Sequence, residues 1–172
     1  MLKRARILVF LLALAFARCG ELPVVPPSPT IDNGFAVKEG NIELSLPIGF
    51  EKEDVVGIDS LYFRYSSVQI SVSKEDQIGV ANLERTLRSR DVIDVRSGGI
   101  DHPDEKGLRA SYEFAPGRRT IQDPDKPFAK QLALDCKNSG QKASFLVLFS
   151  EMKDARIADR ILDSVLVSCR RT

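Results

Sequence analysis

The residue types that could do chemistry in this chain gather in two loops rich in Asp, Pro and Gly. The first, GGIDHPDEKG, holds the single histidine, His102, between Asp101 and Asp104, and the second, TIQDPDKPF, adds Asp123 and Asp125. An imidazole and several carboxylates that met in space could hold a divalent metal, and their oxygen ligands would suit calcium or manganese. Any Ser-His or Cys-His mechanism would also have to use His102.

We predict no metal site and no cofactor, because the spacing of these residues matches neither a calcium loop nor a zinc signature. Stretches rich in Asp, Pro and Gly are far more often solvated turns. A metal-dependent hydrolase built on His102 and the nearby aspartates therefore stands as the alternative to a non-catalytic protein. Convergence of His102, Asp101, Asp123 and Asp125 on one pocket would favour the hydrolase, and scattered exposed side chains would favour a binding protein.

The second loop lies in the longest irregular stretch of the chain, and such loops on a rigid scaffold usually carry recognition surfaces. We predict a partner-binding loop that uses Arg118, Arg119, Asp123, Asp125 and Phe128. An exposed Phe128 would anchor a partner, whereas a buried ring would only pin the loop. Burial is the commoner state for such a residue.

The N-terminal segment resembles a secretory signal peptide. Basic residues precede an uninterrupted apolar run, Ile7 to Phe16, which is shorter than the roughly 20 residues that a membrane-spanning helix needs. Ala15 and Ala17 supply the small side chains of an A-x-A cleavage site, which predicts a cut after Ala17.

A second reading places the cut directly before Cys19, which would then be the acylated lipid anchor of a bacterial lipoprotein. Arg18 argues against this, because the lipoprotein pattern has a small residue before the cysteine; both readings stay open. Either one predicts export to the bacterial envelope, as a periplasmic protein or a membrane-anchored lipoprotein. The corresponding boundaries are a signal peptide over residues 1–18, a Pro-rich tether over 19–34 and a globular domain over 35–172.

The other two cysteines, Cys136 and Cys169, stand in the body of the domain. An oxidising compartment would let them form a disulfide, which we favour over two separately buried thiols. Cys19 would then be the odd cysteine, and an unpaired cysteine at a new N-terminus is easier to understand if it is acylated.

Composition is that of an ordinary domain with one core: 43% of residues are hydrophobic and 28% are charged. Without Lys3, Arg4 and Arg6, 22 basic residues stand against 24 acidic ones. This balance lacks the basic footprint of a nucleic-acid-binding protein, so we predict no nucleic-acid partner. The prolines between Cys19 and the domain predict an extended, semi-rigid spacer.

Strand periodicity begins at Phe35. Apolar and polar residues alternate from Ile42 to Leu46, and a hairpin or a strongly bent strand pair is predicted over residues 61–73. Further strands are predicted at 92–95, 108–114, 131–136 and 143–149. The run ASFLVLFS is apolar at nearly every position, which predicts a strand at the centre of the sheet with both faces covered.

Two segments have helical periodicity. Val80, Leu83 and Leu87 share one face of VANLERTLRSR, and Ile157, Ile161 and their neighbours form a wide apolar stripe on DARIADRILDSVL. The polar residues of the second segment, Asp159 and Asp163 among them, are predicted to point outward. The order of elements predicts an α+β domain with a largely antiparallel sheet and helices on its faces.

Three short motifs carry a resemblance to a known superfamily. They are LPIGF at Leu46 to Phe50, the ISVS strand before a helix, and the terminal ADRILDSV at Ala158 to Val165. From Phe35 to Thr172 the chain resembles the PsbP/Mog-type/DcrB-like superfamily. The resemblance implies a three-layer α/β/α sandwich that ends in an amphipathic helix, and it implies a non-catalytic role in binding other macromolecules. It carries over no functional residue.

The prediction from sequence is therefore a non-catalytic exported envelope protein, a binding or assembly module held near the membrane, whose partner is an unknown envelope protein. Besides the hydrolase, a carrier of a small apolar ligand is an alternative. That function would need a cavity between sheet and helix. Folds of this kind host unrelated functions, so the site must decide.

Overall fold

The computed structural model describes residues 34–39, 41–54, 60–73, 78–118, 125–167 and 169. Its strands are β1 (Phe35–Glu39), β2 (Ile42–Leu46), β3 (Glu51–Glu53), β4 (Ser60–Tyr65), β5 (Val68–Ser73), β6 (Val92–Asp101), β7 (Glu105–Phe114), β8 (Phe128–Cys136), β9 (Lys142–Phe149) and β10 (Leu166–Val167). Its helices are α2 (Val80–Leu87), the 3₁₀ turn η2 (Met152–Asp154) and α3 (Ala155–Asp163). The predicted signal peptide and tether, Cys19 included, lie outside the described residues, apart from Gly34.

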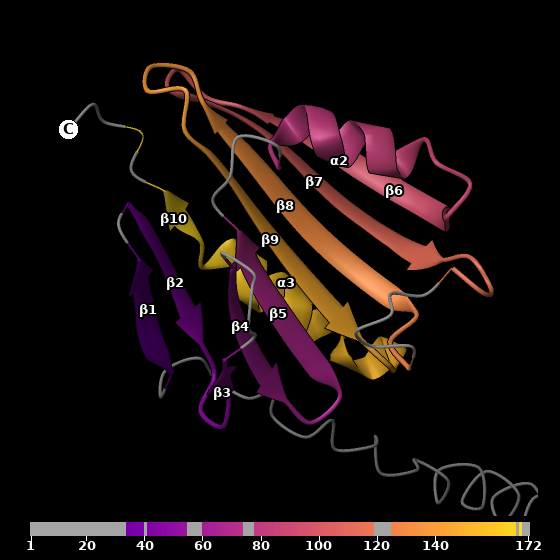
Figure 1. Cartoon of the computed structure of the whole chain (residues 1–172). Coiled ribbons are helices and arrows are strands. Elements are labelled where there is room, and N and C mark those ends of the chain that lie inside the picture. Colours follow the sequence, from indigo (N-terminus) through magenta and orange to yellow (C-terminus); the bar gives the residue numbers. More distant parts are fainter. Residues whose placement is uncertain are drawn as a thin grey trace, which may run out of the picture. The chain divides into compact units, whose positions relative to one another are not determined.

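The strands form two antiparallel sheets (Figure 1). The large sheet has the order β3-β4-β5-β9-β8-β7-β6, and the small sheet has the order β1-β2-β10. The prediction that ASFLVLFS is a central strand is confirmed, because β9 lies in the middle of the large sheet. Phe145 and Val147 are fully buried on one of its faces, and Leu148 is buried on the other.

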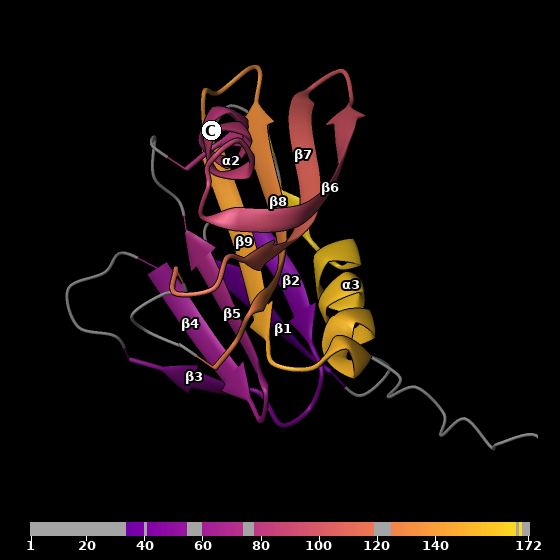
Figure 2. The ribbon, with the colours of Figure 1, turned by 90° about the vertical axis from the view of Figure 1, so that its right-hand side faces the viewer.

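The two helices cover opposite faces of the large sheet (Figure 2). On the α3 face, the buried side chains of α3 pack with those of β2, β5, β8 and β9. On the α2 face, Val80 and Leu83 of α2 pack on β7, β8 and Leu148 of β9. The predicted α+β sandwich with a C-terminal amphipathic helix is therefore confirmed. The small sheet, which packs on the α3 face, was not predicted.

Helix α3 ends against the small sheet. Ser164, which follows its last residue, accepts a hydrogen bond from the Ser45 backbone N–H at 3.0 Å. The Ser164 hydroxyl lies 2.7 Å from the Ile161 carbonyl oxygen. One hydroxyl thus closes the last turn of α3 and fixes β2 beside it, so that the apolar stripe of the helix lies between the two sheets.

Helix α2 begins at a glycine for a steric reason. The backbone N–H of Val80 donates to Asp135 Oδ1 at 2.9 Å, so a carboxylate on β8 satisfies one of the free donors at the helix start. A Cβ on Gly79 would lie 2.1 Å from that same oxygen. A side chain at this position would therefore displace the Asp135 carboxylate that accepts from Val80.

The LPIGF motif forms the turn between β2 and β3. Gly49 has φ of +101°, and a Cβ there would lie 2.7 Å from the ring of Tyr65. Phe50 is buried, and its ring centroid lies 5.5 Å from that of Tyr65. The glycine therefore permits both the left-handed turn and the packing of the aromatic pair.

Cys136 and Cys169 are joined in a disulfide, as the sequence predicted. Cys136 ends β8 and Cys169 follows β10, with 33 residues of separation. The bond therefore closes a loop that contains β9, α3 and β10, and it fastens the last described residue to the large sheet. The two half-cystines are both buried.

Strand boundaries differ from the predicted ones mainly at β6 and β8. Strand β6 continues through Gly98 and Gly99 to Asp101, although glycines are poor strand formers, because β7 pairs with it in register. Strand β8 starts at Phe128 instead of residue 131. Within the described ranges, none of the helices is long and apolar enough to span a bilayer.

Candidate functional site

The first acidic loop is the tip of the β6–β7 hairpin. His102 and Glu105 exchange backbone hydrogen bonds of 3.0 and 3.3 Å across the turn. Lys137 Nζ donates to Asp101 Oδ1 at 2.6 Å, and this hydrogen bond and the positive charge lower the pKa of Asp101. The side chain of Asp104 accepts a hydrogen bond from Asn138. The aspartates of this loop thus hold the hairpin to the β8–β9 turn.

The described part of the second acidic loop, residues 125–128, lies at the other end of β7. Phe128 is paired with Glu113, near the last residue of β7, whereas Asp101 is paired with Lys106, near its first. At about 3.4 Å per residue, the two ends of β7 are roughly 30 Å apart. His102 and Asp125 therefore do not meet, and Asp123 lies outside the described residues.

A metal-dependent hydrolase at these loops is not supported by this arrangement. In the part of the chain that the structure describes, no three His, Cys, Asp or Glu side chains are placed to hold a metal ion together. His102 and Asp101 are exposed at the hairpin tip. The three described residues among the four, Asp101, His102 and Asp125, therefore do not converge on one pocket.

The predicted partner-binding loop is only partly described. Arg118 is exposed and forms an ion pair of 3.4 Å with Asp91, and Asp125 is exposed as well. Arg119 lies outside the described residues. Phe128 was predicted within the irregular stretch but is the first residue of β8, where it is half-buried.

Phe128 instead forms part of a groove on the α3 face. Its ring stacks on that of Phe149 with the centroids 5.7 Å apart. Both residues line a groove with a volume of about 600 Å³, which runs between the first half of β6 and η2. Val95 and Met152 add apolar side chains to its lining, and they are 39% and 64% exposed. The groove thus combines an aromatic floor with exposed apolar side chains.

A β-bulge shapes one wall of this groove. The pairing of β6 with β7 shifts register between Ile93 and Arg96, and Asp94 has φ of 52°. A bulge bends its strand and increases the local twist. Figure 2 shows the first part of β6 turning away from the line of β7. The bend brings Asp94, Val95 and Arg96 to the groove.

The polar lining of the groove carries both signs of charge. Asp94 and Glu113 contribute carboxylates, and Arg96 and Lys130 contribute cations. An enclosed apolar pocket would suit a small apolar ligand, whereas mixed charges around an aromatic floor suit a protein surface. The groove therefore favours a protein ligand over the apolar ligand carrier.

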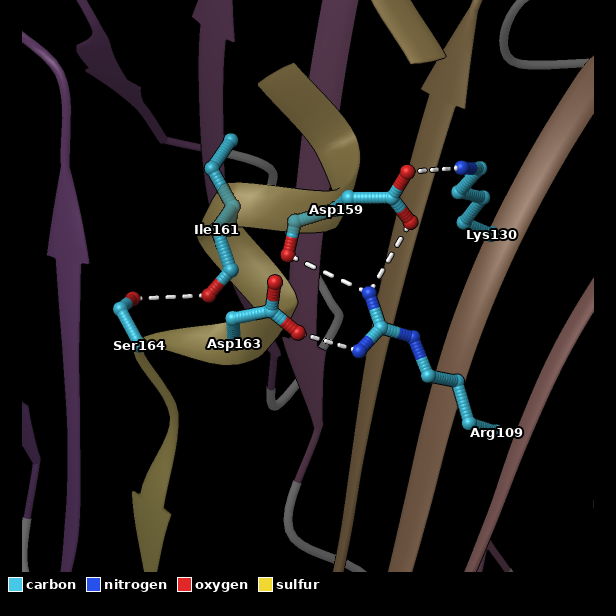
Figure 3. A network of polar contacts seen from close by, with 6 residues as sticks. All are labelled: Arg109, Lys130, Asp159, Ile161, Asp163 and Ser164. Carbon is cyan, nitrogen blue, oxygen red and sulfur yellow. Dashed lines mark hydrogen bonds and ion pairs between the residues drawn. The ribbon is translucent and has the colours of Figure 1, made fainter. Parts of the chain in front are cut away.

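Ion pairs fix α3 to strands β7 and β8 of the large sheet (Figure 3). Lys130, which is only 16% exposed, donates to Asp159 Oδ2 at 2.5 Å. Arg109 on β7 donates to Asp159 Oδ1 at 3.0 Å and also binds Asp163. Burial lowers the pKa of Arg109, but its bonds to Asp163 and Asp159 outweigh that effect and raise the pKa overall.

The prediction that Asp159 and Asp163 point outward holds, because their side chains are 42% and 62% exposed, but the sequence did not predict their cationic partners. Both lie at the border of the apolar stripe, where cations from the sheet reach them. The sequence feature that could have indicated these ion pairs is the presence of two cations, Arg109 and Lys130, within strands that otherwise contain many buried residues. Charged residues in such positions usually have partners, but the partner cannot be chosen before the strands are placed.

Comparison with solved structures shows that this is the fold of PsbP. The solution structure of cyanobacterial PsbP (CyanoP) from Synechocystis sp. PCC 6803 matches with a TM-score of 0.56 and 15% identity, over 87% of this chain and 99% of that one. The Saccharomyces cerevisiae Ran-binding protein Mog1p matches with a TM-score of 0.48 and 10% identity, over 78% of this chain and 95% of its own. No family model and no curated protein matches the sequence.

The match to CyanoP confirms the fold that the three motifs implied. It spans nearly the whole of both chains, so the likeness concerns the complete domain and not one supersecondary unit. At this level of identity the match establishes the fold alone, and the surface of this chain has to supply the argument for function.

Proposed function

We propose that this protein is a non-catalytic binding module of the bacterial envelope, and that it holds a partner protein in the groove between β6 and η2. The observation that carries the proposal is the lining of the groove. Phe128 and Phe149 supply an aromatic floor, and Val95 and Met152 offer apolar contact area to a partner. Buried aromatic and apolar anchors surrounded by polar groups are typical of protein interfaces.

The rigidity of the groove supports this role. Lys130 lies in the groove and is held by Asp159, while Phe128 is held by stacking on Phe149. A site with such fixed side chains loses little conformational freedom when a partner binds. The partner is an envelope protein, because the N-terminal segment has the features of an export signal.

Site-specific photo-cross-linking in the native cell tests the proposal. A photoreactive amino acid at Met152 should capture one defined protein from the envelope, whereas the same group at Ala81, exposed on α2, should not. Val95→Asp should abolish the capture from position 152. The control Leu166→Asp, an equally polar change at an exposed apolar residue of β10, should leave it intact. Equal capture from both positions, or capture that survives Val95→Asp, would contradict the groove as the binding site.

The mode of attachment needs a separate measurement. The intact mass of protein from membrane and soluble fractions distinguishes a chain that begins at an acylated Cys19 from one that begins at Arg18. We expect the acyl mass to disappear in Cys19→Ala. A chain that starts at Arg18 without added mass would make the protein a soluble exported one and leave the groove proposal unchanged.

A further inference from the structure

Strand β6 is the outer strand of the large sheet, and none of the other described segments pairs with its outer side. Figure 2 shows it at the border of the sheet beside β7. The opposite border is β3, which has only three residues, Glu51, Lys52 and Glu53. Short, charged edge strands resist pairing with other chains, whereas a long regular edge invites it. The two borders of this sheet therefore differ in their capacity for strand addition.

The hairpin turn determines which backbone groups of β6 are free. Because His102 and Glu105 exchange both of their hydrogen bonds, they form a hydrogen-bonded pair. Such pairs alternate along an antiparallel ladder, so Ile100, Gly98 and Arg96 also bond to β7. The residues between them, Ser97, Gly99 and Asp101, turn their N–H and C=O groups to the outer side. Each of these residues offers one donor and one acceptor there.

We infer that a second copy of this chain pairs with β6 through these groups, antiparallel and with Gly99 of one copy opposite Gly99 of the other. In this register Ser97 stands opposite Asp101 of the second copy. Every outward N–H from Ser97, Gly99 and Asp101 then meets an outward C=O of the second copy. The association does not depend on the envelope partner proposed for the groove.

The side chains of β6 complement one another in this register. Opposite residues of an antiparallel pair lie on the same face of the sheet, which places Ile100 opposite Gly98 of the second copy. A Cβ on Gly98 or Gly99 would have nothing within 4 Å, so there is room for the facing isoleucine and for the approach of the two strands. The Ser97 hydroxyl faces the carboxylate of Asp101, and no like charges stand opposite each other.

The same features stop the association at two copies. The bulge between Ile93 and Arg96 ends the regular part of β6, so a longer ladder cannot form. After the two β6 strands have paired, the outer borders of the joined sheet are two copies of the short β3. An isologous pair of this kind is closed. It also sets the hairpin tip of each copy, at His102, opposite Arg96, which lines the groove of the other copy.

Disulfide trapping in the full chain tests the register. In a hydrogen-bonded antiparallel pair the facing Cα atoms are about 5.5 Å apart, which suits a disulfide. Gly99→Cys should therefore cross-link into a dimer on mild oxidation. Gly98→Cys is the matched control, because a Cβ there is equally unobstructed. In the proposed register, however, Gly98 of one copy and Gly98 of the other are diagonal neighbours, about 7–8 Å apart. We expect Gly99→Cys to cross-link at least about tenfold faster; equal rates would overturn the register.

Sedimentation equilibrium tests the association itself. The interface is small, so we expect the mass of the purified full chain to rise from monomer to dimer as its concentration approaches about 1 mM. Gly99→Lys places two cations opposite each other and should keep the protein monomeric, whereas Gly98→Lys should weaken the dimer less. A protein that stays monomeric over this range overturns the proposal. A dimer that is insensitive to Gly99→Lys also does so, because its interface must lie elsewhere.

Discussion

The two faces of the large sheet are built differently. On the α3 face, the helix, the small sheet and the large sheet share one apolar core, and Ile161, Phe145 and Leu44 in it are fully buried. On the α2 face, α2 packs over a smaller core that includes alanines such as Ala110, Ala129 and Ala133. Bulky side chains that interlock from three elements bury more apolar surface than small ones beneath a single helix.

Polar groups are also distributed differently between the two faces. Beneath α2, the Tyr112 hydroxyl donates to Gln131 at 2.9 Å, and Gln131 donates to Ser144 at 2.8 Å. Burial raises the pKa of Tyr112, so this hydroxyl keeps its proton. Gln69 Oε1 on the same face is buried and has no hydrogen-bond partner among the described residues. The α3 face should therefore contribute most of the stability, and the α2 face should open first.

The largest expected effect compares one deletion in each core. Ile161→Ala removes a fully buried side chain from between the two sheets and should lower the free energy of unfolding by about 4 kcal/mol. Leu83→Ala on α2 should cost only about 2–3 kcal/mol, because its neighbours are smaller and α2 can shift. Urea denaturation of both variants measures the difference. An equal loss of unfolding free energy in the two variants would contradict the prediction that the α3 face contributes more stability than the α2 face.

The disulfide should add to the stability of the α3 face, because the loop that it closes contains α3. Chain-entropy arguments for a loop of this length give a stabilisation of about 3–4 kcal/mol, and Cys169→Ser should remove it. Thermal unfolding of the variant, with and without reductant, measures the effect. Reductant should lower the unfolding temperature of the native chain and leave that of Cys169→Ser unchanged. A response of the variant to reductant would mean that another thiol contributes.

The ion pairs of α3 should matter more than an exposed pair. Asp159→Asn weakens the bonds to Arg109 and the largely buried Lys130 and should cost about 1–2 kcal/mol. Asp91→Asn breaks the pair with Arg118, in which both side chains are more than half exposed, and should cost less than about 0.5 kcal/mol. Equal costs in urea denaturation would show that the Asp159 network is no stronger than a surface pair.

The start of α2 offers a more local test. Asp135→Ala removes the acceptor for the Val80 N–H and should cost about 1 kcal/mol, as the loss of a helix cap does. Hydrogen exchange should quicken in the first turn of α2 but not in α3. The exposed Asp125→Ala serves as the control and should change neither helix. Faster exchange in α3 as well would mean that the two faces open together.

The smallest expected effect lies outside both faces, at the hairpin tip. The pKa of Asp101 is lowered by Lys137, so the pair favours the folded state while Asp101 is ionised. That contribution is lost as the pH falls through the folded-state pKa. In an NMR titration the Asp101 carboxyl should titrate below its ordinary value, and Lys137→Met should raise its pKa. An unchanged pKa in the variant would assign the shift to other groups.

The local features of this fold can be predicted from the order of residues. Alternation and helical periodicity predicted most strands and both helices, and the continuous apolar run predicted the central position of β9. The LPIGF motif predicts a turn in which Gly49 adopts a positive φ and Phe50 packs beside it. These features depend on neighbours along the chain, so the order of residues is sufficient to predict them.

The pairing of distant residues, in contrast, depends on how the elements pack together. The sequence placed Phe128 in a loop, but pairing of β8 with β7 made it the start of a strand and part of the groove floor. The sequence predicted that Asp159 and Asp163 face outward, but it did not predict their ion pairs, because the cations come from strands many residues away. The free edge of β6 depends on the order of strands in the sheet. Periodicity shows which side of a helix or strand is apolar. Which other element packs against that side depends on the arrangement of the whole domain.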